Sequence, residues 1–156
     1  MKPIFIYPKL RPLFGRFTGI TLLCFVVVFQ HYDHVHKVWY KPTLTDRFKR
    51  HETWHVWQQL CLAALGIILT PPGLLLGIPW WVCLAVPVVL PFALYVLCWF
   101  IEILLPPYSR AYHDICFEGE ARYHEYDKNP RYVPFSFLRF IPNRDWSKLG
   151  RDKYLR

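Results

Sequence analysis

The sequence predicts a mainly α-helical membrane protein with a small β element. Residues 53–101 form a run of 49 positions that contains no Asp, Glu, Lys or Arg. One helix that crosses a bilayer needs roughly 20 apolar residues, so this run is long enough for two crossings. A shorter apolar segment at 19–30 is rich in β-branched and aromatic side chains, which favours strands over a helix.

The N-terminal region, residues 1–46, is expected to consist of strands and loops. The charge-free apolar core around segment 19–30, residues 17–29, spans about 13 residues, whereas a spanning helix needs at least roughly 17. We therefore predict one or two strands at the membrane surface, with a short crossing by residues 17–30 as the alternative. The segment 31–44 is polar and His-rich and contains a proline, which is typical of a hairpin or loop.

The segment 47–105 is expected to form an active-site helix and a membrane hairpin. Thr45 or Asp46 is a plausible N-cap for a helix that runs from about residue 47 to about residue 69. The Pro-Pro-Gly at 71–73 is expected to end this helix, because proline lacks a backbone donor and clashes with the preceding turn.

Two further helices and a tail are expected after this turn. One helix should run from about residue 80 to about residue 105 and end at the next pair of prolines. The segment 106–128 should contain an acidic helix at about 109–126. Residues 129–156 are basic and aromatic, and we expect them to form a surface tail.

Basic residues flank the apolar run on both sides. The first 50 residues hold nine Lys or Arg and the residues after 101 hold ten, whereas the connection near 70–73 has none. By the positive-inside rule, both basic flanks are expected on the cytoplasmic side of the membrane. We attribute the net charge of +8 to contact with membrane lipid and not to nucleic acid. Residues 1–156 are expected to form a single membrane-associated domain.

The first predicted helix carries the pattern H-E-x-x-H. His51 and His55 lie one helical turn apart on one face, so both imidazoles can reach one cation. Zn²⁺ lowers the pKa of a bound water to about 7, and Glu52 is placed to take its proton as the general base. Catalytic zinc sites normally use three protein ligands, so another helix should supply one more.

The third ligand is expected on the acidic segment FEGEAR, residues 117–122, which supplies Glu118 and Glu120. A hairpin of two crossings would return this segment to the side of the membrane on which His51 lies. One metal needs only one of the two acids, and the spacing alone leaves both open.

Two motifs resemble a known family. HETWHVWQ at 51–58 is similar to the H-E-x-x-H-x-x-Q helix of gluzincin-type zinc metallopeptidases. AYHDICFEGEARYHEYDKNPRY at 111–132 resembles the downstream segment of a group of small bacterial membrane proteins. In that group an apolar span and an F-E-x-E-A motif follow a zincin helix. The resemblance covers roughly residues 19–140 and implies a zincin-like helix pair joined by the two-helix membrane hairpin.

The resemblance implies that His51 and His55 bind Zn²⁺ and that Glu52 is the general base. Membrane-embedded gluzincins use the pattern E-x-x-A-D, which maps the third ligand onto Glu118. Thermolysin-like enzymes use E-A-x-x-D, which maps it onto Glu120. We favour Glu118 as the third ligand.

The chain departs from both patterns at the final acid. Arg122 replaces the supporting Asp in the first mapping, and His124 replaces it in the second. Neither side chain is the carboxylate that normally orients a ligand histidine. A catalytically inactive, zincin-like membrane scaffold or interaction protein is therefore the alternative function.

The resulting prediction is a membrane-embedded zinc metallopeptidase that cleaves a peptide bond at the cytoplasmic face of the bacterial inner membrane. Membrane lipid and a peptide or protein substrate are the expected partners, and a chain this small is a candidate homo-oligomer. A di-iron membrane oxidase was also considered, because H-x-x-x-H is its first histidine box. Such centres need about eight clustered histidines, and this chain has seven and no H-x-x-H-H.

Several other side chains are candidates for supporting roles. Gln58 is expected to contact a ligand or the substrate backbone, or to pack against the acidic helix. Donors to a developing oxyanion are normally Tyr, His or Arg, and the candidates here are Tyr112, His113, Tyr123 and His124. The His-rich segment 31–36 is a candidate second metal site, although such a loop is more often solvated.

Overall fold

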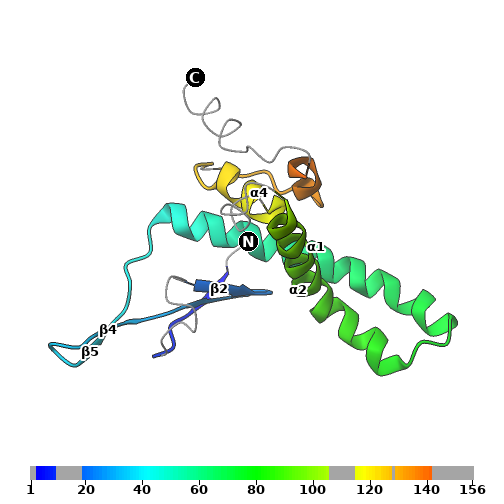
Figure 1. The fold of residues 1–156 in the computed structure, drawn as a ribbon, viewed down its shortest axis with the longest axis horizontal. Helices are drawn as coiled ribbons and strands as arrows, with labels where there is room; N and C mark the ends of the chain where they lie inside the picture. The colour runs from blue at the N-terminus through cyan, green and yellow to red at the C-terminus, as the bar shows by residue number, and fades with distance from the viewer. Residues whose placement is uncertain (1–2, 10–18, 106–114, 128, 142–156) are drawn as a thin grey trace, which may run out of the picture.

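The computed structural model describes residues 3–9, 19–105, 115–127 and 129–141 of the 156-residue chain. Within these residues the chain is mainly helical, with some short strands (Figure 1). In chain order the elements are β1 (Ile4–Ile6), β2 (Gly19–Leu22), β3 (Phe25–Val28), β4 (His31–Asp33), β5 (Val38–Tyr40), α1 (Asp46–Leu75), α2 (Trp80–Leu104), α4 (Cys116–His124) and the 3-10 helix η2 (Ser136–Phe140).

The N-terminal strands form two small antiparallel or mixed sheets. In the larger sheet the order is β1-β3-β2, with β1 parallel and β2 antiparallel to β3. The segment 19–30 therefore contains the two strands β2 and β3, and the alternative of a short helical crossing is wrong for it. The predicted hairpin in 31–44 is confirmed, because β4 and β5 pair antiparallel.

The helix α1 begins where the sequence places its cap. The Thr45 side chain accepts a hydrogen bond from the Phe48 backbone amide at 3.1 Å, which satisfies one free donor of the first turn. The helix then continues for 30 residues to Leu75.

The prediction that α1 ends at the proline pair is wrong. Pro71 and Pro72 lie inside the helix, which continues to Leu75. A proline has no backbone N–H to donate, but its carbonyl can still accept a helical hydrogen bond and its φ is fixed near the helical value. The Leu76 amide accordingly donates to the Pro72 carbonyl at 3.0 Å. The chain turns only at Gly77, whose φ of +78° is a backbone conformation that glycine adopts without strain.

Both α1 and α2 are long and apolar enough to cross a membrane. Only 6% of the most apolar stretch of α2 is fully buried within the chain, and its other side chains are exposed or half-buried. The two helices approach closely at Gly66, where an added Cβ would lie 2.6 Å from the Pro87 Cα atom. A larger side chain at this position would force the helices apart.

The last helix is shorter than expected within the described residues. We predicted a helix over about 109–126, and α4 covers Cys116–His124; residues 109–114 lie outside the described part of the chain.

The prediction that residues 129–141 form a surface tail is wrong, because Phe137 and Phe140 are buried against α4. Burial of these two aromatic rings stabilises the fold, and the basic side chain between them, Arg139, stays exposed. Residues 142–156 lie outside the described part.

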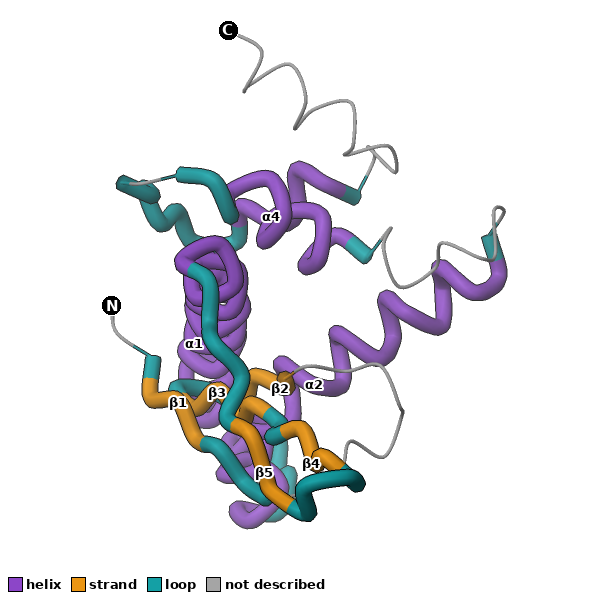
Figure 2. Tube along the Cα trace, turned by 90° about the vertical axis from the view of Figure 1, so that its left-hand side faces the viewer, coloured by secondary structure: helices purple, strands orange, loops and turns teal. Residues whose placement is uncertain are grey.

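The first half of α1 lies between the three-stranded sheet and α4 (Figures 1 and 2). Val26 and Val28 of β3 pack on Val56 of α1 on one side. On the other side, an apolar cluster joins α1 to α4 and η2; its buried members are Leu62, Ile115, Cys116, Phe117, Phe137 and Phe140. Figure 1 shows the turn between α1 and α2 at the end of α1 that lies away from the β4–β5 hairpin.

Candidate metal centre

The two histidines of the H-E-x-x-H pattern face each other on α1. Their ring centroids are 4.7 Å apart, and His55 Nε2 lies 3.1 Å from His51 Nε2. This follows from the helical period, which places residues four apart on one face. Both imidazoles therefore direct the same nitrogen into one small space.

Glu118 completes this cluster from α4. Its Oε1 lies 3.2 Å from His55 Nε2, and its Oε2 lies 3.5 Å from His51 Nε2. One ligand atom from each of the three residues falls within 4.8 Å of the others. Ligands that bind zinc tetrahedrally at about 2.0–2.2 Å are about 3.3 Å apart, so the spacing suits a small divalent ion.

The donor set also suits a metal electrostatically. Glu118 is 2% exposed, and its Oε2 is buried without a hydrogen-bond donor among the described residues. Burial by itself raises the pKa of the Glu118 carboxyl, but the adjacent imidazoles of His55 and His51 outweigh it. The pKa therefore lies well below its usual range. An ionised, under-coordinated carboxylate beside two imidazoles can hold a metal ion.

Glu120 lies outside this cluster and has a different set of partners. It is fully buried, and its Oε2 accepts a hydrogen bond from Gln58 Nε2 at 2.8 Å. Ser136 Oγ donates to the other carboxylate oxygen. Burial raises the pKa of the Glu120 carboxyl. Of the two acids that the sequence left open, the structure brings Glu118 to the histidines.

Gln58 links Glu120 to the histidines. Its Oε1 lies 2.9 Å from His55 Nδ1, and its Nε2 also donates to the Phe117 carbonyl at 3.0 Å. The expected contact between Gln58 and a candidate ligand histidine is therefore present. Gln58 connects α1 with α4 beside the His51–His55–Glu118 group.

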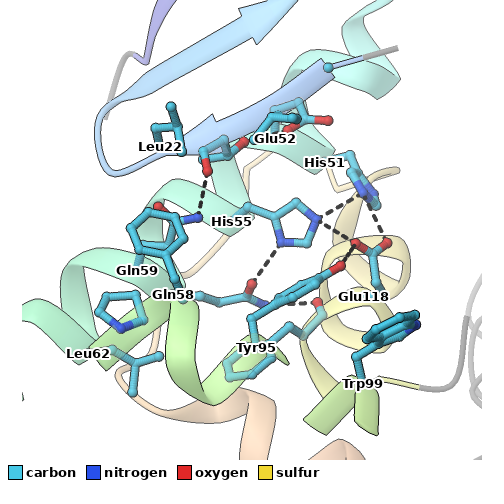
Figure 3. A pocket seen from close by; sticks show the side chains of 16 residues that line it. Leu22, His51, Glu52, His55, Gln58, Gln59, Leu62, Tyr95, Trp99 and Glu118 are labelled. Atoms are coloured by element: carbon cyan, nitrogen blue, oxygen red, sulfur yellow. Dashed lines mark hydrogen bonds and ion pairs between the residues drawn. The ribbon is translucent and has the colours of Figure 1, made fainter. Parts of the chain in front are cut away.

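Tyr95 of α2 is a site residue that the sequence did not indicate. Its phenol donates a hydrogen bond to Glu118 Oε1 at 3.0 Å (Figure 3). Tyr95 stands in an apolar run, where aromatic residues are common, so no sequence pattern distinguishes it from a lipid-facing side chain. Only the packing of α2 against α1 brings it to the cluster.

Glu52 points toward the sheet side of the site. Its side chain is buried, and its Oε2 accepts a hydrogen bond from the Thr21 hydroxyl of β2 at 2.5 Å. Two turns further along α1, Gln59 Nε2 donates to the Thr21 carbonyl at 2.9 Å, and Gln59 Oε1 accepts from the Leu23 amide at 2.5 Å. These bonds fix β2 beside the helix that carries the histidines.

A cavity of about 670 Å³ joins these groups. The cluster residues and Glu52 line one part of it, together with β2 (Figure 3). The opposite wall comes from α2 and is largely apolar; it consists of Pro91, Phe92, Tyr95 and Trp99. The cavity therefore combines a polar, metal-compatible face with an apolar face built by a candidate membrane helix.

The remaining candidates have other surroundings. His124 stacks on Trp54 with ring centroids 4.2 Å apart and pairs with Asp127 at 2.6 Å, and Tyr123 packs on Phe140. Tyr112 and His113 lie outside the described residues. In the segment 31–36, Asp33 bonds His36 at 2.6 Å, and the metal-compatible group found among the described residues is the one on α1 and α4.

Comparison of the chain with models of protein families, with curated proteins and with solved structures gives no match. The resemblance to gluzincins therefore stays a prediction that rests on the two sequence motifs.

Proposed function

We propose that the chain is a membrane-embedded zinc metallopeptidase that hydrolyses a peptide bond at the cytoplasmic face of the membrane. One observation supports this most strongly. Nitrogen and carboxylate ligands from α1 and α4, 63 residues apart between His55 and Glu118, converge within 4.8 Å. They do so in a cavity that Glu52 also lines.

His51, His55 and Glu118 would hold the ion. When bound, Zn²⁺ acts as a Lewis acid on a carbonyl and makes water a stronger nucleophile at neutral pH. Glu52 would take the proton of the attacking water and return it to the leaving amine. The Thr21 hydroxyl donates to Oε2 of Glu52, which orients the carboxylate.

The strand β2 is a suitable docking edge for a peptide. It ends the sheet order β1-β3-β2, so its outer side has no neighbouring strand within this sheet. The carboxamide of Gln59 occupies the Thr21 carbonyl and the Leu23 amide, so a docking peptide would have to displace it or pair elsewhere along β2. A peptide backbone forms the same kind of amide pair when it adds to a strand edge.

The apolar wall of the cavity supports a substrate that lies near the membrane. Phe92 and Trp99 belong to α2, the helix with the most outward-facing apolar surface. Burial of a substrate's apolar side chains there would stabilise the complex by about 25 cal/mol per Å² of apolar surface removed from water. The basic flanks on both sides of the apolar run favour the cytoplasmic face.

One contact favours the alternative of an inactive scaffold. Arg122 Nε lies 3.7 Å from Glu118 Oε2, at the position where the family pattern has an acid. A guanidinium so close to the Glu118 carboxylate competes with a metal cation for the negative charge of that carboxylate. The two functions therefore predict different behaviour of the same purified protein.

The test compares the full-length wild type with Glu52→Gln in lipid nanodiscs. We expect one zinc per chain in both, and cleavage of a membrane-proximal peptide library by the wild type only, as read by mass spectrometry. Loss of a general base lowers turnover by about 10²- to 10⁴-fold. Asp46→Asn removes an exposed acid at the start of α1 and should leave cleavage unchanged. Zinc binding without any Glu52-dependent cleavage would favour the scaffold.

A further inference from the structure

Glu125, the residue after the last turn of α4, lies behind the metal cluster. It is 6% exposed, and its Oε2 lies 3.5 Å from His51 Nδ1. Its other oxygen accepts from Arg47 Nη2, and its backbone carbonyl accepts from Arg50 Nε at 2.6 Å. Two arginines of α1 thus hold this acid against the outer face of a ligand histidine.

The two nitrogens of the His51 ring have different surroundings. Nε2 faces His55 and Glu118. Nδ1 is buried and makes no hydrogen bond of ordinary length within the described residues, and the carboxylate of Glu125 is an acceptor at only slightly longer range. A histidine that binds metal through Nε2 carries its proton on Nδ1, so this proton needs an acceptor.

We propose that Glu125 is the positioning residue for His51, accepting its Nδ1 proton and fixing the tautomer and ring orientation in which Nε2 binds zinc. This inference rests on the proposed function, because it takes His51 to be a metal ligand. It supplies a carboxylate that the family resemblance places at position 122 or 124, where this chain has Arg122 and His124. Glu125 follows Arg122 by three residues, which is about one helical turn.

The geometry leaves one oxygen of Glu125 for His51. Arg47 Nη2 donates to Oε1 of Glu125, and Oε2 lies 3.5 Å from His51 Nδ1. A carboxylate at this place raises the basicity of the ring and so strengthens its bond to a metal.

His55 has a separate partner, which provides an internal comparison. Its Nδ1 lies 2.9 Å from Gln58 Oε1, and Gln58 is in turn held by Glu120. The two ligand histidines are therefore oriented by different side chains from different elements. A change at Glu125 should alter the tautomer and ring orientation of His51 and leave the tautomer of His55 unchanged.

The experiment measures zinc affinity of the full-length protein in nanodiscs by competition with a chromophoric chelator. Removal of an outer partner of a ligand histidine lowers metal affinity by about 10- to 100-fold, and we expect this loss for Glu125→Ala. Glu125→Gln keeps a neutral acceptor and should show a smaller loss. The matched control Asp46→Ala removes an exposed acid at the start of α1 that does not contact the cluster, so affinity should stay within about threefold.

A second readout separates positioning from mere folding. In ¹⁵N-labelled, zinc-loaded protein, Glu125→Ala should shift the Nδ1 resonance of His51 and leave that of His55 unchanged. Equal affinity of Glu125→Ala and the wild type, or an equal loss in Asp46→Ala, would overturn the role of Glu125 while the zinc site stands. A wild type that binds no zinc would instead overturn the proposed function itself.

Discussion

The phenol of Tyr95, on the apolar helix α2, donates a hydrogen bond to Glu118 on α4 at 3.0 Å. Residue 95 therefore connects a candidate membrane helix to the acid that faces both histidines. Hydrogen bonds to ionised groups are about twice as strong as bonds between neutral groups. The position of the carboxylate thus depends on how α2 packs against α1, and the hairpin of α1 and α2 is part of the site.

Replacement of Tyr95 by Phe should weaken both the fold and the metal site. The change leaves the buried Glu118 with one donor fewer, which lowers the free energy of unfolding by about 1.5–3 kcal/mol. Zinc affinity should fall by about tenfold or more, because Tyr95 helps to orient a ligand. Chemical denaturation and chelator competition measure the two effects. Tyr40→Phe, at an exposed ring on β5, is the control, and equal values for both variants would refute the role of Tyr95.

Replacement of Glu120 by Ala should lower stability and preserve the metal. Gln58 loses one of its acceptors, and an unsatisfied buried polar group lowers the free energy of unfolding by about 1–3 kcal/mol. Because Glu120 is not among the three residues of the cluster, the variant should still contain one zinc per chain by elemental analysis. A folded variant without zinc would instead make Glu120 the third ligand.

Replacement of Gly66 by Ala should separate the two long helices. The new methyl group would lie 2.6 Å from the Pro87 Cα atom, and overpacking of this kind lowers the free energy of unfolding by about 1–3 kcal/mol. Thermal unfolding in detergent measures the change. Ala64→Val adds apolar bulk two residues away at an exposed position and should leave the midpoint nearly unchanged. A wild-type midpoint for Gly66→Ala would mean that α1 and α2 do not approach closely there.

Long, strongly patterned features of the sequence were the predictable part of the fold. The uncharged run 53–101 indicated both long helices, and the β-branched segment 19–30 indicated strands. Pro71 and Pro72 were misleading, because a proline pair near a helix end still allows one more turn through its carbonyls. Phe137 and Phe140 were hidden among basic residues, although their spacing of three matches one face of a helical turn.

For the candidate site, residues within one helix were predictable and contacts between elements were not. The spacing of His51 and His55 follows from helix geometry alone. The choice between Glu118 and Glu120 depends on how α4 is rotated against α1, and apolar packing sets that rotation. Tyr95 reaches the site from α2 and Glu125 from the end of α4, and no local sequence pattern distinguishes these two residues from their neighbours.

The most direct test of the account is the zinc content and zinc X-ray absorption of the full-length chain in nanodiscs, with Glu118→Ala beside the wild type. The account predicts one zinc per wild-type chain, with nitrogen and oxygen ligands at about 2.0–2.2 Å that include two imidazoles. It predicts that Glu118→Ala, though folded, loses at least about 100-fold in zinc affinity. A wild type without zinc, or a Glu118→Ala variant that binds zinc as tightly as the wild type, would contradict it.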